Sequence, residues 1–583
     1  MLSLSKHVPY LNLQLSREAL MKYSKSSLRA AFGILLFILY ADPIVSAQTR
    51  PVAVVGGTLI DGTGRSAVED SVIVFQDGRI QSVGKRGEVA LPRGAQVIDA
   101  KGKTILPGLI DGHCHYWEWL GELYLAYGVT TCPDINNSPT EWIIAQKDGI
   151  QKGKIRGPRL WISGHALDGP RPVGMPEQRW QRGSIIVRTE DEARKAVRAH
   201  VEKGMDGFKV LERVSSEVAK AIADEARKLG KPVIGHSVNM FEAIDAGYTS
   251  IERSWAVMFT TIRDVKKRAE VDMDRMNGKV GTVEAHVNMV PDQFDEIIKA
   301  MVAKDIHWSP AWATQFRALS PRAAEMKKRE LALLKNPRLS YLPPYNLESV
   351  EGYFAGFEKM TPEKRETLVG AYKLVQDFAR RYVAAGGKMH SGSDPGTLLP
   401  AYALHAELEL DIDAGLTPLF AIQSASLNVA KAWGKDKDYG SVENGKVADL
   451  VIVRGDVMKD ISATQNVEKV FMDGKPVDTS FHANYRNPIP RTIADRYVTN
   501  LNQLAPASLV AGNAGLVKLN GANFRPTHQV LIDGKKADSK FVSGREVEVQ
   551  VPPLAAGTHK ITVIDPGIPT SESAPLYLVV SFQ

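Results

Sequence analysis

The chain has 583 residues, of which 44% are hydrophobic and 24% charged, a composition typical of a folded protein with several domains. Its formal net charge is +7, but residues 1–47 carry +3 of that charge and the remainder contains no compact run of Lys and Arg. An excess of that size does not indicate a nucleic-acid partner. The two cysteines, Cys114 and Cys132, are too few for a disulfide framework and lack zinc-finger spacing. We therefore expect any metal to be held by His, carboxylate or modified Lys.

Residues 1–47 have the pattern of a secretory signal peptide, with Met21 as an alternative start. Basic residues precede an apolar run at 30–41, and a small-x-small cleavage pattern, Val-Ser-Ala, follows at 45–47. The run is shorter than the ~20 residues that span a bilayer. We therefore expect a secreted or periplasmic protein without a stable membrane span, whose mature chain begins near Gln48.

Two strand-rich pieces flank a long middle region. Residues 51–106 alternate apolar runs with Gly-rich turns, among them Asp77-Gly78, and are expected to form a small antiparallel β unit. Residues 439–480 repeat this pattern, with a second Asp-Gly turn at 473–474. We expect the two pieces to join in one composite β-sandwich.

The middle region, 107–435, alternates short β-like runs with helical stretches. Helices are predicted at 189–204 and 215–230, because each stretch follows Thr or Ser at N-cap spacing and ends at Gly. The eight β-like runs are ILPGLIDGHCH, GVTTCPDI, RLWISGH, DGFKVL, PVIGHS, YTSIER, DIHWSP and KMHSGSD. Eight strands with intervening helices predict a (β/α)₈ TIM barrel.

The sequence pattern changes at residues 503–583, where closely spaced alternating strands are typical of an all-β, immunoglobulin-like sandwich. The segments KLNGANF, VLIDG, FVSGREVEVQVP and AGTHKITV resemble the IPT/TIG family. The expected fold class is thus α/β: a TIM barrel with a flanking sandwich built from both ends of the catalytic region, plus a C-terminal sandwich.

His113 and His115 stand two residues apart at the end of the first barrel run. Residues i and i+2 of a strand face the same side, so both imidazoles can reach one ion while Cys114 points the other way. The carboxyl ends of barrel strands are where active sites of this fold lie. Two histidines that merely fill a core are the alternative, and the HxH spacing alone does not decide.

Several motifs in the expected order resemble the amidohydrolase superfamily, in particular its imidazolonepropionase-like and Xaa-Pro dipeptidase-like branch. The motifs are TILPGLIDGHCH, FKVL, IGHS, HSGSD, LHAELEL and DYGSVENGKVADLVIV, and the likeness runs from about residue 52 to 478. The resemblance implies one or two divalent metals, most simply Zn²⁺. The implied ligands are His113, His115, Lys209 (carboxylated), His236 and Asp394.

The resemblance also implies that Asp394 takes a proton from the attacking water. Read without it, Lys209 is a surface lysine and Asp394 a turn former. His165, at the end of the third run, is a third catalytic candidate beside Asp394 and Arg253, since it could orient a substrate carbonyl. A capped strand-end histidine is the plainer interpretation of His165.

The sequence departs from the family pattern at strand six, where Arg253 replaces the usual histidine in SIER. A guanidinium cannot coordinate a cation. Three outcomes follow: one metal with Arg253 supplying positive charge in place of a second, a second metal rescued by a group such as Glu252, or a site that has lost catalysis.

The function expected is that of a metal-dependent amidohydrolase, which cleaves an amide, peptide-like or cyclic amide bond of a small-molecule or dipeptide-like substrate with metal-activated water. Arg253 could stabilise the oxyanion or bind a substrate carboxylate. The alternative is a catalytically impaired barrel that acts as a ligand-binding or surface-interaction protein. A homo-oligomer is compatible with either function.

Overall fold

The computed structural model describes residues 50–582, except 136–137, 172–182, 340–341, 343–344, 395–398, 400, 490–498, 523, 525, 565–572 and 574. The predicted signal peptide therefore lies outside the described residues. Among the residues described, no helix is both long and apolar enough to cross a membrane.

The eight predicted barrel runs each contain a strand. They are β6 (Leu109–Ile110), β7 (Val129–Asp134), β8 (Arg159–Ile162), β11 (Phe208–Val210), β12 (Val233–Gly235), β13 (Ser250–Glu252), β14 (His307–Ser309) and β15 (Lys388–Met389). Strands β6 to β8 pair in parallel, and so do β11 to β15, beside which β9 (Leu167–Asp168) and β10 (Ile185–Ile186) add an edge. Backbone bonds Asp206 N to Ile162 O (2.8 Å) and Gly112 N to Ser391 O (3.0 Å) connect the two groups. The eight strands form the TIM barrel, and β9 and β10 extend its sheet at the edge beside β11.

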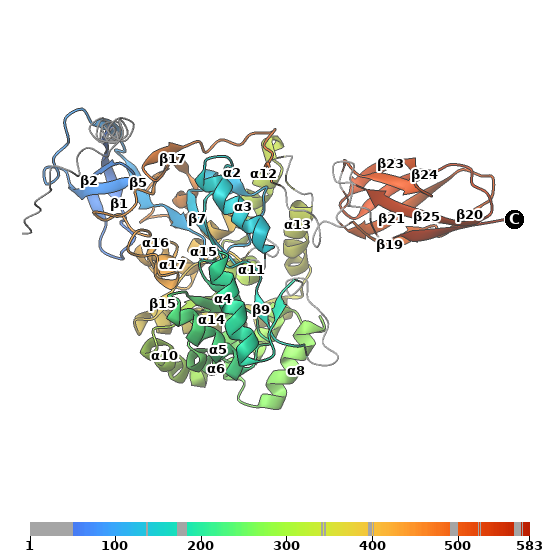
Figure 1. Cartoon of the computed structure of the whole chain (residues 1–583), viewed down its shortest axis with the longest axis horizontal. Coiled ribbons are helices and arrows are strands. Elements are labelled where there is room, and N and C mark those ends of the chain that lie inside the picture. Colours follow the sequence, from blue (N-terminus) through green and yellow to red (C-terminus); the bar gives the residue numbers. More distant parts are fainter. Residues whose placement is uncertain are drawn as a thin grey trace, which may run out of the picture. The chain divides into compact units, whose positions relative to one another are not determined.

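Helices cover the barrel strands (Figure 1). In chain order they are α2 (Gly121–Ala126), α3 (Thr140–Gln151), α4 (Glu190–Glu202), α5 (Ser216–Lys228), α6 (Met240–Ala246), α7 (Ser254–Thr261), α8 (Val265–Met276), α9 (Thr282–Ala285), α10 (Phe294–Ala303), α11 (Trp312–Phe316), α12 (Ala323–Leu334), α13 (Tyr345–Glu358), α14 (Pro362–Ala384), α15 (Tyr402–Asp413), α16 (Pro418–Ser424) and α17 (Leu427–Ala432). The hydroxyls of Thr189 and Ser215 accept the N-cap hydrogen bonds of α4 and α5, as the sequence predicts. The ring of Trp308 on β14 packs on Phe378 of α14 with centroids 5.2 Å apart, so this long helix stabilises the barrel wall.

Strands that precede the barrel and strands that follow it share one sheet. They are β1 (Val52–Leu59), β2 (Val68–Gln76), β3 (Arg79–Lys85), β4 (Gln96–Asp99), β5 (Lys103–Pro107), β16 (Leu450–Arg454), β17 (Val467–Met472) and β18 (Lys475–Val477). The pair β5–β16 joins the two ends. Positive φ angles at both residues of Asp77-Gly78 and of Asp473-Gly474 match the tight hairpin turns predicted there.

One detail of this sheet differs from the expectation of an antiparallel unit. Strand β1 pairs in parallel with both β4 and β5. The chain after β3 crosses back over the sheet before β4 begins, so the two later strands run in the same direction as β1.

The C-terminal unit is all β, as predicted (Figure 1, orange to red). Its strands are β19 (Asn500–Ala505), β20 (Ser508–Val510), β21 (Gly515–Ala522), β22 (Gln529–Ile532), β23 (Lys535–Ser543), β24 (Glu546–Val551), β25 (Gly557–Ile564) and β26 (Leu576–Ser581). Alternate residues of β24, such as Val547, Val549 and Val551, are buried in its core, which is the period-two pattern of a sheet with one solvated face.

Candidate metal centre

Two histidines and one aspartate bring their ligand atoms together at the carboxyl end of the barrel strands. The Nε2 atoms of His113 and His115 lie 3.6 Å and 3.4 Å from Asp394 Oδ1, and the three ligand atoms are all within 4.8 Å of one another. Two ligand atoms that share a tetrahedral Zn²⁺ at ~2.1 Å are ~3.4 Å apart. The observed spacing therefore fits a common divalent ion.

Two atoms of this group, one on His113 and one on Asp394, have no hydrogen-bond partner among the described residues. His113 and Asp394 are fully buried, and both His113 Nε2 and Asp394 Oδ1 have no hydrogen-bond partner there. Burying such atoms unpaired costs about 1–3 kcal/mol each. A cation between them would remove that cost, so the residues present fit the metal implied by the sequence.

A backbone hydrogen bond and close packing join the HxH segment to the segment that carries Asp394. Asp394 N donates to His113 O at 2.8 Å, and Asp394 adopts a positive φ of 41°. At Gly392 an added Cβ would lie 2.5 Å from the Cβ of His113. Only glycine fits there, because the segment after β15 passes directly against the HxH segment.

Glu252 orients His113 from behind. Its Oε2 lies 2.7 Å from His113 Nδ1, and its Oε1 accepts a hydrogen bond from Ser250 Oγ at 2.7 Å. Burial raises the pKa of Glu252, but hydrogen bonds from His113 and His390 outweigh burial and hold it well below its usual range. An ionised carboxylate on Nδ1 leaves the Nε2 lone pair directed at Asp394. Glu252 is therefore placed to orient His113, and its rescue of a second metal stays a prediction.

Lys209 and His236 lie nearby but contact each other. Lys209 Nζ is 3.1 Å from His236 Nε2, and His236 Nδ1 is 3.2 Å from Glu212 Oε2. The His236 ring stacks 6.0 Å from that of His113. Burial lowers the pKa of Lys209 to about 7, and the charge of Arg253 lowers it further. Burial and the charge of Lys209 lower the pKa of His236 to about 4, so His236 is neutral at pH 7.

Arg253 makes an ion pair with the second oxygen of the same aspartate. Its Nε contacts Asp394 Oδ2, and its guanidinium lies 4.7 Å from the ring centroid of Trp255, which Arg275 also contacts at 4.4 Å. Burial lowers the pKa of Arg253 to about 9, at which it is still protonated at neutral pH. Asp394 therefore faces the histidines with one oxygen and a fixed cation with the other.

The remaining sequence candidates lie outside this group. The His165 ring is beside Gly183, where an added Cβ would lie 3.7 Å from it, and its catalytic role stays a prediction. His390 bonds Ser250 Oγ at 2.9 Å, and His405 bonds Thr464 Oγ1 at 2.9 Å. Both histidines are buried and make hydrogen bonds away from the three proposed ligands.

A disulfide that the sequence analysis did not predict lies on the other side of the HxH segment. Cys114 is bonded to Cys132 of β7, with Cα atoms 5.9 Å apart. One bond is not a framework, and eighteen residues of separation carry no local signal of pairing. The opposite orientation of Cys114 and the two histidines is confirmed.

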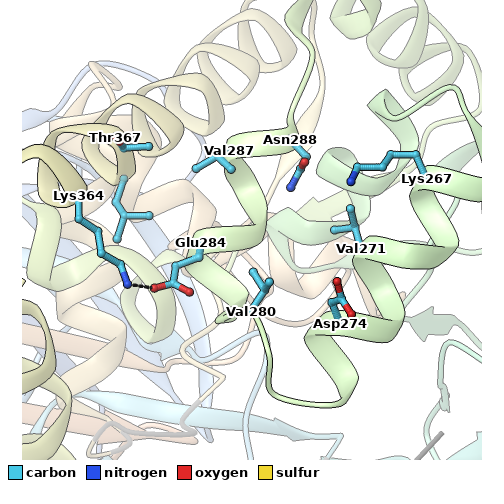
Figure 2. Close-up of a pocket in the computed structure, with 10 residues that line it drawn as sticks. Lys267, Val271, Asp274, Val280, Glu284, Val287, Asn288, Lys364 and Thr367 are labelled. Atoms are coloured by element: carbon cyan, nitrogen blue, oxygen red, sulfur yellow. Dashed lines mark ion pairs between the residues drawn. The ribbon is translucent and has the colours of Figure 1, made fainter. Parts of the chain in front are cut away.

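A separate pocket of about 410 Å³ lies among α8, α9 and α14 (Figure 2). Its polar lining includes Lys267, Asp274 and an ion pair of Lys364 with Glu284. None of the predicted site residues lines this pocket. It therefore contributes nothing to the metal centre.

Comparisons with known proteins match most of the chain. A profile described as the amidohydrolase family matches residues 104–477, and one described as the IPT/TIG domain matches residues 500–578. The chain is 41% identical over 78 residues to an imidazolonepropionase of Symbiobacterium thermophilum, which is 13% of this chain and 18% of that enzyme. The aligned part is thus less than a fifth of that relative's length.

Two solved structures resemble the fold. A Xaa-Pro dipeptidase with bound methionine in the active site is 22% identical, with a TM-score of 0.51 over 73% of this chain and 100% of that chain. The ochratoxinase of A. niger is 18% identical, with a TM-score of 0.52 over 75% of this chain and 99% of that chain. At these identities the likeness concerns the fold.

Proposed function

The chain belongs to the amidohydrolase family, whose members are metal-dependent hydrolases of C–N bonds, and we propose that it hydrolyses an amide, peptide-like or cyclic amide bond. The observation that carries the proposal is the convergence of His113, His115 and Asp394 on one point, where His113 Nε2 and Asp394 Oδ1 are buried without a hydrogen-bond partner among the described residues. Such a set holds about one divalent ion per chain. The substrate class is a small molecule or a dipeptide-like compound.

The bound ion, most simply Zn²⁺, would supply Lewis acidity that activates water and polarises the scissile carbonyl. The chain's own residues position the reaction. Glu252 holds the His113 imidazole through Nδ1, so that only Nε2 is available as a ligand. Asp394, beside both imidazoles, is the group proposed to take a proton from the attacking water.

Arg253 has two roles in this proposal. Its contact with Asp394 Oδ2 keeps the carboxylate ionised, because a neighbouring cation favours the charged form. The guanidinium also offers charge-assisted hydrogen bonds to an oxyanion or a substrate carboxylate. A permanent cation at this point makes a second metal unnecessary.

Lys209 is proposed to enter the centre as a carbamate. A buried neutral amine reacts with carbon dioxide, forming an N–C bond and releasing one proton, and the product is an anionic oxygen ligand. The lowered pKa of Lys209 provides the neutral form near pH 7. Its distance of 3.1 Å from His236 Nε2 would place both groups beside the ion.

The alternative is a barrel that binds a ligand without catalysis, with the C-terminal sandwich as an adhesion module. The pairing of Arg253 with Asp394 is the observation that favours it, since this pair occupies a carboxylate oxygen that a metal could use. Elemental analysis of the purified protein separates the two functions.

We expect about one equivalent of a divalent metal per chain and turnover of a compound within a panel of dipeptides, N-acyl amino acids and lactams. Metal-free protein that is inert on the whole panel, even after Zn²⁺ is added, would favour the binding function. The C-terminal sandwich is proposed to bind or space in both cases.

The protein is further proposed to be exported. The charged segment, apolar run and cleavage pattern of residues 1–47 support export, and the Cys114–Cys132 bond is of a kind that persists in oxidising compartments. Intact mass of the exported protein should correspond to a chain that begins near Gln48. A mass that retains residues 22–47 would contradict the proposal.

A further inference from the structure

The only two cysteines of the chain form a disulfide next to the proposed ligands. Cys114 lies between His113 and His115 and is bonded to Cys132 in β7. Both cysteines are fully buried, and Cys114 Sγ lies 3.0 Å from the hydroxyl of Tyr124. Cys114 reaches Cys132 and Tyr124, whereas His113 and His115 reach Asp394, so the disulfide and the two imidazoles have different neighbours.

The segment that carries the ligands is not part of a regular strand. Strand β6 ends at Ile110, and the backbone beyond it connects to two different neighbours. Toward β7, Cys114 N donates to Pro133 O at 3.3 Å and Ile135 N donates to Cys114 O at 3.1 Å. Toward the segment after β15, Asp394 N donates to His113 O at 2.8 Å. The segment is thus bonded to β7 on one side and to the segment after β15 on the other. The disulfide is its covalent link to β7.

We propose that the Cys114–Cys132 disulfide preorganises the metal centre by fixing the backbone between its two histidine ligands. Without an ion, His113 Nε2 and Asp394 Oδ1 are buried and unpaired. Rotation of the segment away from Asp394 would expose these atoms to hydrogen bonds with water, so it is favoured. Such a rotation turns both imidazoles out and draws Cys114 away from β7, which the S–S bond opposes. Ligands that are held in place in advance cost less to assemble when the ion binds.

This inference rests on the proposed metal centre, and it implies that the disulfide forms before metal is bound tightly. A chain whose cysteines are still thiols lacks the attachment and holds metal weakly. Disulfide exchange with an oxidising disulfide joins the two sulfurs and transfers two electrons and two protons to the reagent, which leaves as two thiols. Tight metal binding then follows oxidation, which places maturation of the site in an oxidising compartment.

The test compares the wild-type chain with the double variant Cys114→Ala/Cys132→Ala. The apo forms are titrated with Zn²⁺ against a chromophoric chelator, and thermal unfolding is recorded in parallel. We expect the Kd for Zn²⁺ to rise about 10- to 100-fold, as for other groups that orient ligands. The control is Ile452→Ala, a truncation of a buried side chain on β16 that should lower Tm and leave the Kd unchanged.

Each outcome is decisive. A double variant that binds Zn²⁺ within about twofold of wild type overturns the inference and leaves the metal centre intact. If Ile452→Ala weakens binding as much as the double variant, the effect is general destabilisation and the inference is wrong. A wild-type chain that binds no divalent metal contradicts the proposed function instead.

A second comparison applies if the double variant does not fold. The wild-type protein is treated with a phosphine, which becomes its oxide while the disulfide and one water yield two thiols, and excess reagent is removed before titration. The reduced protein should show the same weakened Kd, and reoxidation should restore tight binding. Unchanged affinity at complete reduction, verified by thiol titration, would overturn the inference.

Discussion

The two sides of the candidate centre contain similar residues in opposite states. On one side, the ligand atoms of His113, His115 and Asp394 lie close together, and His113 Nε2 and Asp394 Oδ1 have no hydrogen-bond partner among the described residues. On the other side, His236 lies between Lys209 and Glu212, with a contact on each ring nitrogen. A cation would satisfy the two unpaired atoms of the first side, whereas both ring nitrogens of His236 on the second side already have a partner.

In the proposed function, this difference would favour one metal over two. Asp394 stands at the boundary, with Oδ1 toward the histidines and Oδ2 in contact with Arg253. The arginine places a positive charge where a second ion would otherwise balance the carboxylate. Changing either side should therefore change metal content in a predictable direction.

Removing a ligand from the unpaired side should have the largest effect. In His113→Ala the remaining His115 and Asp394 are too few to hold the ion tightly, so metal and activity should be lost together. We expect kcat/KM to fall by about a thousandfold or more, because water activation at neutral pH depends on the metal. Elemental analysis and kinetics on a verified substrate measure both quantities. Full metal content in this variant would show that the ligand assignment is wrong.

Replacing the cation at the boundary should alter stoichiometry. Arg253→His offers an imidazole on the side of Lys209 and His236, and metal content should rise from about one to about two ions per chain. Arg253→Ala removes charge-assisted hydrogen bonds of about 1.5–3 kcal/mol each and should lower kcat/KM about 10- to 100-fold. Arg227→Ala, on the exposed part of α5, is the matched control. Wild-type kinetics in Arg253→Ala would mean that the arginine does not act on substrate.

Neutralising the carboxylate behind His113 should weaken the metal without removing a ligand. Glu252→Gln keeps the shape of the side chain but no longer favours the His113 tautomer with a free Nε2. The Kd for Zn²⁺ should rise about tenfold, as measured by chelator competition. Ser250→Ala, which removes a hydrogen bond to the other oxygen of Glu252, should have a smaller effect. Equal Kd values for Glu252→Gln and wild type would exclude the orienting role.

The last prediction concerns Lys209 and the pH dependence of stability. Burial lowers its pKa to about 7, below its value of ~10.4 in an unfolded chain, so the unfolded state binds more protons between these values. The free energy of unfolding of the apo protein should therefore rise with pH across this window, by up to about 1.4 kcal/mol per pH unit. Below about pH 7 the destabilisation is complete and no longer changes.

The variant Lys209→Met should lack this contribution. Its stability relative to wild type should be highest below about pH 7 and decline toward pH ~10, as measured by denaturant unfolding in CO₂-free buffer. A stability difference that does not vary with pH would mean that Lys209 titrates normally in the folded chain.

Local sequence was sufficient to predict the helices, turns and strands and, in the candidate metal centre, the HxH pair. Caps at Thr189 and Ser215, Asp-Gly turns and period-two strands depend on neighbours along the chain, so their positions could be predicted. The HxH pair was predictable for the same reason, because two residues apart on an extended backbone means one common side. Amidohydrolase motifs extended this to Asp394, with its partner Arg253 recognised as a departure.

Three features were decided only by tertiary structure. Glu252 contacts His113 across 139 residues of sequence, and its role as orienting group depends on barrel closure, which brings the end of β13 within reach of the HxH segment after β6. The Cys114–Cys132 bond requires β7 to pass directly beside the HxH segment, and two cysteines alone do not specify a pairing. The contact of Arg253 with Asp394 depends on a positive φ of 77° at the arginine, which no periodicity predicts. Sequence determined which groups are available, whereas closure of the barrel decided which of their atoms are paired and which are left for a metal.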